Sequence, residues 1–289
     1  MQMRVLLTIP HVFLPKDGSL YSSQTESKRT LKTHALQRAT IENLSRHSRE
    51  HWIHASLGKA KPVVTRELST NNGLDLTIQL YTPAGHSLSE TLPKHPKLKI
   101  IDPMIGDMTA VPGVASRRAL EQAMEYDLVG YMEDDLLIED PEFFHKIMCM
   151  TKNTGGEFAF MPHRCEQIPG MGDVILSGDP DGGRADLFWA TGETIIVDWP
   201  LGIRKFYRAT NPHSGCFFLE QQQALRVLRY WENRDWKCDF LLSGPLEQAG
   251  SGMILPVLKI MKPTPEDYRF LMVRHVDELW RRHAFENAR

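Results

Sequence analysis

The stretch LVGYMEDDLLIEDPEFF, residues 128–144, decides how this chain folds. Five apolar residues, LVGYM, lead directly into three acids, Glu133, Asp134 and Asp135. A short apolar run without alternation is typical of a strand that is buried on both faces, as in a parallel sheet. Ligands bind at the carboxyl ends of such strands in α/β folds. The sequence therefore predicts a central strand with three carboxylates at its functional end.

The two acids further along the stretch have a structural explanation. Asp140 precedes Pro141, and aspartate is favoured as an N-cap while proline is favoured at the first helical position. Glu139 lies near the same helix start, where the helix dipole favours negative charge. We expect Asp140 to cap a helix over PEFFHKIMCM, residues 141–150, and assign no chemistry to either acid.

The first half of the chain alternates strands and helices around this stretch. Apolar runs predict strands, and amphipathic or helix-forming segments predict helices. We expect strands at RVLLTIP (4–10), LDLTIQLYT (74–82) and LKIID (98–102), and helices at RTLKTHALQRATIENLSRH (29–47) and VASRRALEQAMEYD (114–127). This alternation favours an α/β fold with a mostly parallel mixed sheet flanked by helices.

The second half is less regular, with short strands separated by Gly, Pro and Asp turns. The expected strands lie within EFAFMPHR (157–164), GDVILSG (172–178), TIIVDWP (194–200) and SGCFFLE (214–220), and the helices at QQQALRVLRYW (221–231) and VDELWRRHAFENA (276–288). No repeat or linker divides the chain. We interpret it as a single domain, 1–289, with a nucleotide-type half over 1–150 and an irregular half over 151–289.

The overall composition excludes several classes of protein. The net charge of −2 gives no general reason to expect binding to nucleic acid or to an acidic membrane, so any anion must bind at a local site. Four dispersed cysteines without a CxxC pair fit a reducing compartment and argue against a structural zinc site. No segment approaches the roughly 20 apolar residues that cross a bilayer. We therefore expect a cytoplasmic protein whose contact with a membrane, if any, is peripheral.

Two interpretations of the acidic triplet are open from the residues alone. In extended geometry Glu133 and Asp135 point to one side of the strand and Asp134 to the other. Two carboxylates on one partly buried side repel each other, and a hard cation such as Mg²⁺ or Mn²⁺ removes that penalty. The alternative is a solvated acidic turn without a metal.

YMEDDLLIEDPEFF, together with the preceding VASRRALEQAM, resembles the acidic-motif region of GT-A glycosyltransferases. It is most similar to the Glu-Asp-Asp form in the N-acetylglucosaminyltransferase family that acts on mannose-terminated N-glycans. The resemblance covers roughly residues 113–148 and implies a GT-A fold and a nucleotide-sugar-dependent transferase. It implies Asp135 as the direct ligand of Mn²⁺ or Mg²⁺, with Glu133 and Asp134 supporting the metal and the sugar or ribose. The cation would stabilise the negative charge on the leaving diphosphate.

The same resemblance suggests further residues that contact the donor. The loop after the first strand commonly contacts the base in GT-A folds, which makes Thr8, Ile9 and Pro10 candidates, although a plain strand end is the alternative. Arg117 and Arg118 precede the acidic strand and could reach the base or a phosphate. The implied donor is a nucleotide sugar, with a UDP-sugar expected because UDP is the commonest nucleotide among metal-dependent members.

Candidates for the metal and for the acceptor side come from the second half. His275, between an apolar run and the last expected helix, matches the C-terminal histidine that several GT-A enzymes supply to the metal, and a neutral imidazole is a competent ligand. His213 and His163 are weaker metal candidates. Ser214 and Gly215 resemble the glycine-bearing strand of the acceptor cleft, where a sugar can approach the backbone.

An inverting transferase also needs a base that takes the proton of the acceptor hydroxyl. Glu247, in SGPLE, is the first candidate because the segment predicts a loop that leads into a short helix, and Asp239 is the second. Glu247 could instead be a helix-start glutamate that the dipole favours. The implied acceptor is a glycan or glycolipid, and the resemblance does not decide between retention and inversion.

Two other functions compete with a transferase. A nucleotidyltransferase of a related fold would carry a Gly-rich basic loop after the first strand, but TIPHVFLPKDGS, residues 8–19, has one glycine and one lysine. A two-metal phosphodiesterase would need a second dense His/Asp cluster, which the sequence lacks. A carbohydrate-binding protein without turnover remains the non-enzymatic alternative.

Overall fold

A five-stranded sheet forms the centre of the computed structural model. Its strand order is β13-β6-β1-β4-β5, and all neighbouring pairs are parallel except β13 with β6. The strands are β1 (Met3–Pro10), β4 (Leu74–Tyr81), β5 (Leu98–Ile101), β6 (Leu128–Met132) and β13 (Cys216–Glu220). The structure describes residues 2–15, 26–48, 51–57, 62–69, 74–168, 170–175, 192–209, 212–236 and 244–276, with only the backbone described in 51–57 and 62–69.

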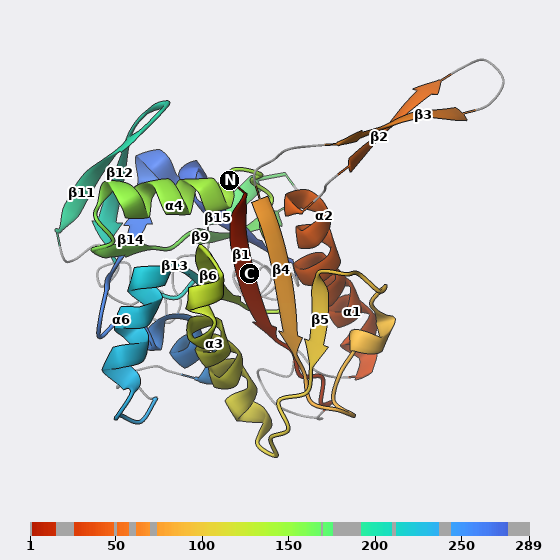
Figure 1. Ribbon diagram of the computed structural model, residues 1–289, viewed down its shortest axis with the longest axis horizontal. Coiled ribbons are helices and arrows are strands. Elements are labelled where there is room, and N and C mark those ends of the chain that lie inside the picture. The colour runs from red at the N-terminus through yellow and green to blue at the C-terminus, as the bar shows by residue number, and fades with distance from the viewer. Residues whose placement is uncertain are drawn as a thin grey trace.

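Side chains alternate across this sheet into two apolar layers. Val5, Leu7 and Ile9 of β1 are buried in one layer, whereas Leu6 is buried in the other. The first layer includes residues of α1 (Arg29–Gln37), α2 (Asn43–His47) and α4 (Phe143–Asn153), and the second includes residues of α3 (Val111–Glu121) and α6 (Gln221–Trp231). Helices therefore cover both faces, which is why the strands are apolar throughout (Figure 1).

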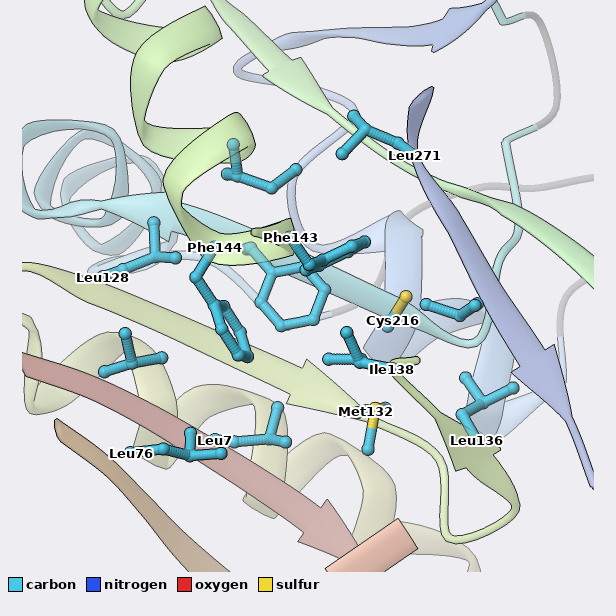
Figure 2. Packing of buried hydrophobic residues seen from close by; sticks show 14 of the residues in the cluster. Leu7, Leu76, Leu128, Met132, Leu136, Ile138, Phe143, Phe144, Cys216 and Leu271 are labelled. Atoms are coloured by element: carbon cyan, nitrogen blue, oxygen red, sulfur yellow. The ribbon is translucent and has the colours of Figure 1, made fainter. Parts of the chain in front are cut away.

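The aromatic residues of α4 lie in the first apolar layer, against the central sheet. Phe143 and Phe144 lie edge-on to each other, with ring centroids 5.5 Å apart, and both lie edge-on to Phe218 of β13. Figure 2 shows them between the strand residues Leu7 and Leu128 on one side and Leu271 on the other. These rings join the central sheet to the segment that follows the acids.

Two smaller sheets pack beside the first. One has the order β10-β9-β15-β7 and comprises β7 (Leu136–Leu137), β9 (His163–Ile168), β10 (Gly172–Ile175) and β15 (Met272–His275). The other has the order β11-β12-β14-β8 and comprises β8 (Phe158–Phe160), β11 (Thr194–Trp199), β12 (Gly202–Arg208) and β14 (Lys259–Pro263). A separate hairpin, β2 (His51–Leu57) with β3 (Pro62–Ser69), projects from the body of the molecule (Figure 1).

The predicted α/β fold, a mostly parallel mixed sheet flanked by helices, is confirmed. The expected helix over 29–47 consists of α1, a π-helical turn at Arg38–Glu42 and α2. None of the helices in the described ranges has the length and apolarity needed to cross a membrane. The expected helix over 276–288 lies almost wholly outside the described residues.

Two expectations about local structure were wrong. Helix α4 begins at Phe143, not at Pro141, and its N-cap residue is Glu142. The Asp140 carboxylate accepts a hydrogen bond from the Glu142 amide at 2.9 Å and pairs with Lys146 at 2.6 Å, so it stabilises the turn before the helix. EFAFMPHR is not one strand, because Met161 and Pro162 separate β8 from β9 and the two halves join different sheets.

Candidate functional site

The three acids lie on the connection between two sheets. Glu133 follows the last residue of β6 in the central sheet, and Leu136 begins β7 in the second sheet. The Glu133 amide donates to the Gly215 carbonyl at 2.8 Å, and the Val276 amide donates to the Asp135 carbonyl at 2.9 Å. The backbone of the triplet is therefore fixed from both sides, by the chain before β13 and by the end of β15.

Asp135 faces two cationic or basic groups. Its Oδ2 atom lies 3.4 Å from His275 Nε2 and 3.7 Å from Lys32 Nζ. The other ring nitrogen of His275, Nδ1, lies 2.6 Å from Glu166 Oε1. His275 thus lies between two buried carboxylates, and Glu166 fixes the orientation of the imidazole ring.

The pKa values of this pair shift in opposite directions. Burial by itself would lower the pKa of His275, but the charge of Asp135 and the hydrogen bonds to Asp135 and Glu166 outweigh it and raise the pKa to about 9. Burial would raise the pKa of Asp135, but His275 and Lys32 hold it well below its usual range. Without a metal, the two groups form an imidazolium–carboxylate ion pair at neutral pH.

Glu133 is held by different partners. Its Oε1 lies 3.3 Å from His213 Nε2, and its Oε2 lies 3.9 Å from Arg164 Nη1. Gly215 has a φ of +66°, and a Cβ atom there would lie 2.8 Å from Glu133 Oε2. Glycine is therefore required at 215 both by the left-handed backbone and by the closeness of this carboxylate.

Strand β9 supplies two of the partners. Arg164 and Glu166 are two residues apart, so they project from the same face of the strand, and both are almost fully buried. One contacts Glu133 and the other His275. These two residues were not predicted from the sequence, and neither were His11 and Lys32. The alternation of charged residues within HRCEQI, residues 163–168, was the signal that could have found them.

Other predicted donor-binding residues have partners within the protein. Thr8 Oγ1 donates to the Gly130 carbonyl at 3.2 Å, while Ile9 and Pro10 are buried in β1. Arg117 and Arg118 lie on the exposed side of α3, and each pairs with Glu121 at 2.7 Å. Among the described contacts, neither arginine pairs with an acid of the triplet. Contact of these five residues with a nucleotide stays a prediction.

The acceptor-side candidates lie near the acids only in part. Ser214 is buried, and its hydroxyl donates to the Pro162 carbonyl at 2.6 Å. Glu247 ends the short helix α7 (Pro245–Glu247). Burial raises the pKa of Tyr131 well above its usual range, and the charges of Glu133, Asp134 and Glu247 raise it further. Asp239 lies outside the described residues.

The donor set fits a hard divalent cation that also binds ligand oxygens. Within the described ranges, no three His, Cys, Asp or Glu side chains converge into a preformed metal cage. Asp135 Oδ1 is nevertheless buried without a hydrogen-bond partner among the described residues, and Glu166 leaves His275 Nε2 directed at Asp135. Mg²⁺ is usually bound by one or two carboxylates together with water and substrate phosphates, so two protein ligands suffice for it.

A cleft of about 610 Å³ adjoins this arrangement on the side of the second sheet. It is lined by Glu166 and His275 together with charged residues of neighbouring elements, among them Arg38, Glu139 and Arg274. Arg274 is paired with Glu139 at 2.6 Å and with Asp173 at 3.1 Å, so the wall of the cleft is polar and its charges are balanced.

Comparisons with known proteins give no family. No protein-family model and no curated protein matches the chain. Among solved structures, S. aureus TarS 1-349 is similar with a TM-score of 0.47 and 11% identity, covering 90% of this chain and 58% of that one. A candidate nucleotide-diphospho-sugar transferase from Desulfovibrio desulfuricans G20 is similar with a TM-score of 0.40 and 12% identity, covering 91% and 80%. The chain spans less than two thirds of the TarS fragment, and at TM-scores below 0.5 neither likeness identifies a family or an activity.

Proposed function

We propose that this chain is a metal-dependent glycosyltransferase of the GT-A type, which transfers a sugar from a nucleotide sugar to a hydroxyl group of a glycan or glycolipid. A UDP-sugar is the proposed donor, and a hexose or N-acetylhexosamine is the proposed sugar. The observation that carries the proposal is the series Glu166–His275–Asp135 at the carboxyl end of β6. A histidine that contacts a carboxylate through one nitrogen and faces a second acid through the other is the usual setting of a metal-binding imidazole.

Asp135 and His275 would hold the metal, and Glu166 would orient His275. When bound, Mn²⁺ or Mg²⁺ supplies a fixed positive charge beside the diphosphate that leaves the sugar. Lys32, whose ammonium lies 3.7 Å from Asp135, adds a protein cation to the same region. Glu133 is proposed to support the metal through its position beside Asp135, held there by Arg164 and His213.

Glu247 is the proposed base that takes the proton from the acceptor hydroxyl, with Asp239 as the second candidate. Support for Glu247 comes from its place at the end of the short helix α7, directly before the turn Gln248–Gly252, where a Cβ atom at Gly250 would lie 3.7 Å from Tyr131 Cε1.

Thermal unfolding in the presence of UDP-sugars with Mn²⁺, and again with a chelator, tests the proposal. A ligand that binds the folded state at 100 times its Kd stabilises it by about 2.7 kcal/mol, so the Tm rises by several degrees. We expect this rise with metal and its loss with chelator. Calorimetry that detects uptake of neither Mn²⁺ nor Mg²⁺ with any sugar nucleotide would refute the proposal. Binding without donor hydrolysis or transfer would instead indicate a carbohydrate-binding protein.

A further inference from the structure

The side chain of His11 connects the acids to a distant loop. His11 directly follows β1, and its side chain is 1% exposed. Nδ1 lies 2.5 Å from Asp134 Oδ2, and Nε2 lies 3.0 Å from the backbone nitrogen of Leu88. Both ring nitrogens are therefore engaged, one by the middle acid of the triplet and the other by a main-chain amide 77 positions away.

These two partners determine where the proton of the imidazole lies. A backbone N–H can only donate, so Nε2 must accept and cannot carry a proton. The proton of the neutral ring is then on Nδ1, which donates to the Asp134 carboxylate. His11 is thus a neutral donor of fixed orientation, and Asp134 Oδ2 is a committed acceptor.

Asp134 is the acid of the triplet that a diffusible ligand can reach most readily. Its side chain is 23% exposed, compared with 7% for Glu133 and 12% for Asp135. Because Oδ2 is engaged by His11, rotation of the carboxylate is restrained and Oδ1 is the atom left to a ligand. A restrained carboxylate oxygen is a selective acceptor for a hydroxyl, because no reorganisation is needed when the ligand binds.

The loop that holds His11 is itself braced. The Phe13 amide donates to the His86 carbonyl at 2.8 Å, and Thr91 Oγ1 donates to the Leu88 carbonyl at 2.6 Å. The Ser89 amide donates to Ser87 Oγ at 2.9 Å. The position of Leu88, and with it the imidazole, therefore depends on the packing of residues 86–91 against the chain that follows β1.

We propose that His11 is a positioning residue, which holds Asp134 so that its Oδ1 accepts a hydrogen bond from a hydroxyl of the ribose or sugar of the donor. This inference rests on the proposed function, to which it adds a residue and an atom. The Leu88 N–H fixes the orientation of His11, and His11 fixes that of Asp134. His11 therefore affects the bound ligand without touching it.

Two amide substitutions separate the two hydrogen bonds of His11. In His11→Asn the side-chain nitrogen can take the place of Nδ1 and donate to Asp134, but nothing accepts from Leu88. In His11→Gln the amide reaches the place of Nε2 and its oxygen can accept from Leu88, but the donor to Asp134 is lost. Each variant therefore keeps one of the two hydrogen bonds, and both variants remove the imidazole ring.

The variant with the higher activity is expected to be the one with the lower stability. Loss of a hydrogen bond to a charged group corresponds to about a 10- to 100-fold change. We expect His11→Gln to lower kcat/KM for the donor by that factor, mainly through KM, while His11→Asn stays within about threefold of wild type. The Tm should be lower for His11→Asn, which leaves a buried N–H unsatisfied, than for His11→Gln.

A purely structural histidine would make activity follow Tm, and that result, or equal kcat/KM for the two variants, would overturn the proposal. Nitrogen-15 NMR of the wild-type imidazole provides a measurement independent of turnover. We expect a protonated Nδ1 and an unprotonated Nε2, and the reverse tautomer or a doubly protonated ring would overturn the inference. If the wild-type protein binds no nucleotide sugar, the proposed function fails, whereas unequal behaviour of the variants in an active enzyme supports His11.

Discussion

The acids and their partners come from two differently built regions. Glu133, Asp134 and Asp135 are consecutive in sequence and end a strand of the mostly parallel sheet. The groups around them, Lys32, Arg164, Glu166 and His275, are dispersed in sequence, and the His275–Glu166 contact joins residues 109 positions apart. The first region shows how a local pattern places charge. The second shows how the pairing of β9 with β15, together with Lys32 of α1, assembles a chemical environment that no local pattern contains.

The largest expected effect comes from the first region. In Asp135→Asn the carboxylate that would hold the metal becomes a neutral amide, while the shape of the side chain is nearly unchanged. Removing one electrostatic stabiliser of a transition state typically lowers kcat by about 100- to 1,000-fold. We expect a loss of that size in transfer or donor hydrolysis, measured with saturating Mn²⁺.

Asp140→Asn is the matched control, because Asp140 is a nearby aspartate that contacts only the start of α4 among the described residues. Its turnover should stay within about twofold of wild type. Asp135→Asn also leaves His275 and Lys32 without their carboxylate, so urea unfolding must accompany the kinetics. Unchanged turnover in a folded Asp135→Asn protein would exclude Asp135 as the metal ligand.

A smaller effect is expected from the second region. In Glu166→Gln the neutral amide no longer stabilises the Nδ1–H of His275 by charge, although it can still accept a hydrogen bond. Loss of such a supporting group typically lowers metal affinity or activity by about 10- to 100-fold. Titration with Mn²⁺ should show the weaker binding. Gln167→Ala, at the exposed neighbouring position, should bind Mn²⁺ like wild type, and equal affinity in both variants would contradict the role of Glu166.

The residues of the first region could be predicted from the sequence almost completely, whereas only some residues of the second region could. The apolar run LVGYM predicts the buried strand and therefore the position of the acids at its end. His275 was predicted through a family resemblance. Arg164 and Glu166 were not predicted, because β9 pairs with β15 across more than a hundred residues and a charged residue in a strand normally indicates an exposed face. Burial of these charges becomes understandable only when the opposing charges are known.

A stability test of the first region concerns the point where β6, the strand that leads to the acids, pairs with β13 in the central sheet. Gly130 lies in β6, and a Cβ atom there would lie 2.5 Å from Phe218 Cδ1 and 2.8 Å from the Phe217 carbonyl oxygen. Backbone cannot move aside easily, so Gly130→Ala should lower the free energy of unfolding by about 1–3 kcal/mol. Gly106→Ala is the control, since nothing lies within 4 Å of its added Cβ, and it should be neutral or slightly stabilising. Equal urea midpoints for the two variants would show that β13 does not pack closely against Gly130.

The contact between Gly130 and β13 shows why pairing between strands could not be predicted from the sequence. LVGYM was correctly assigned to a buried strand, but nothing in it indicated that its glycine lies against an antiparallel neighbour from residues 216–220. Similarly, the segments between Gly202 and Arg208 and between Lys259 and Pro263 were not predicted as strands. Charged residues interrupt both segments, Arg204 and Lys205 in the first and Lys259 and Lys262 in the second, although Lys262 is buried in the fold.

The smallest expected effect concerns His163, the residue next to Arg164 on β9. Its ring is buried, Nε2 donates to the Pro263 carbonyl at 2.8 Å, and the ring lies against Tyr268. Burial, together with the nearby charge of Lys262, lowers the pKa of His163 to about 3.

Because the folded-state pKa lies below the unfolded value, the unfolded chain binds a proton between about pH 6.5 and pH 3 that the folded chain does not. Folding is therefore least affected by His163 above pH 6.5, and stability falls as the pH drops through that window. The contribution of His163 between pH 7 and pH 5 is about 2 kcal/mol at most. We expect urea unfolding to show a smaller decrease for His163→Gln than for wild type over this interval, and NMR to show a neutral His163 ring at pH 5. A ring that titrates near pH 6.5 in the folded protein would mean that the second region admits water at β9, unlike the buried end of β6.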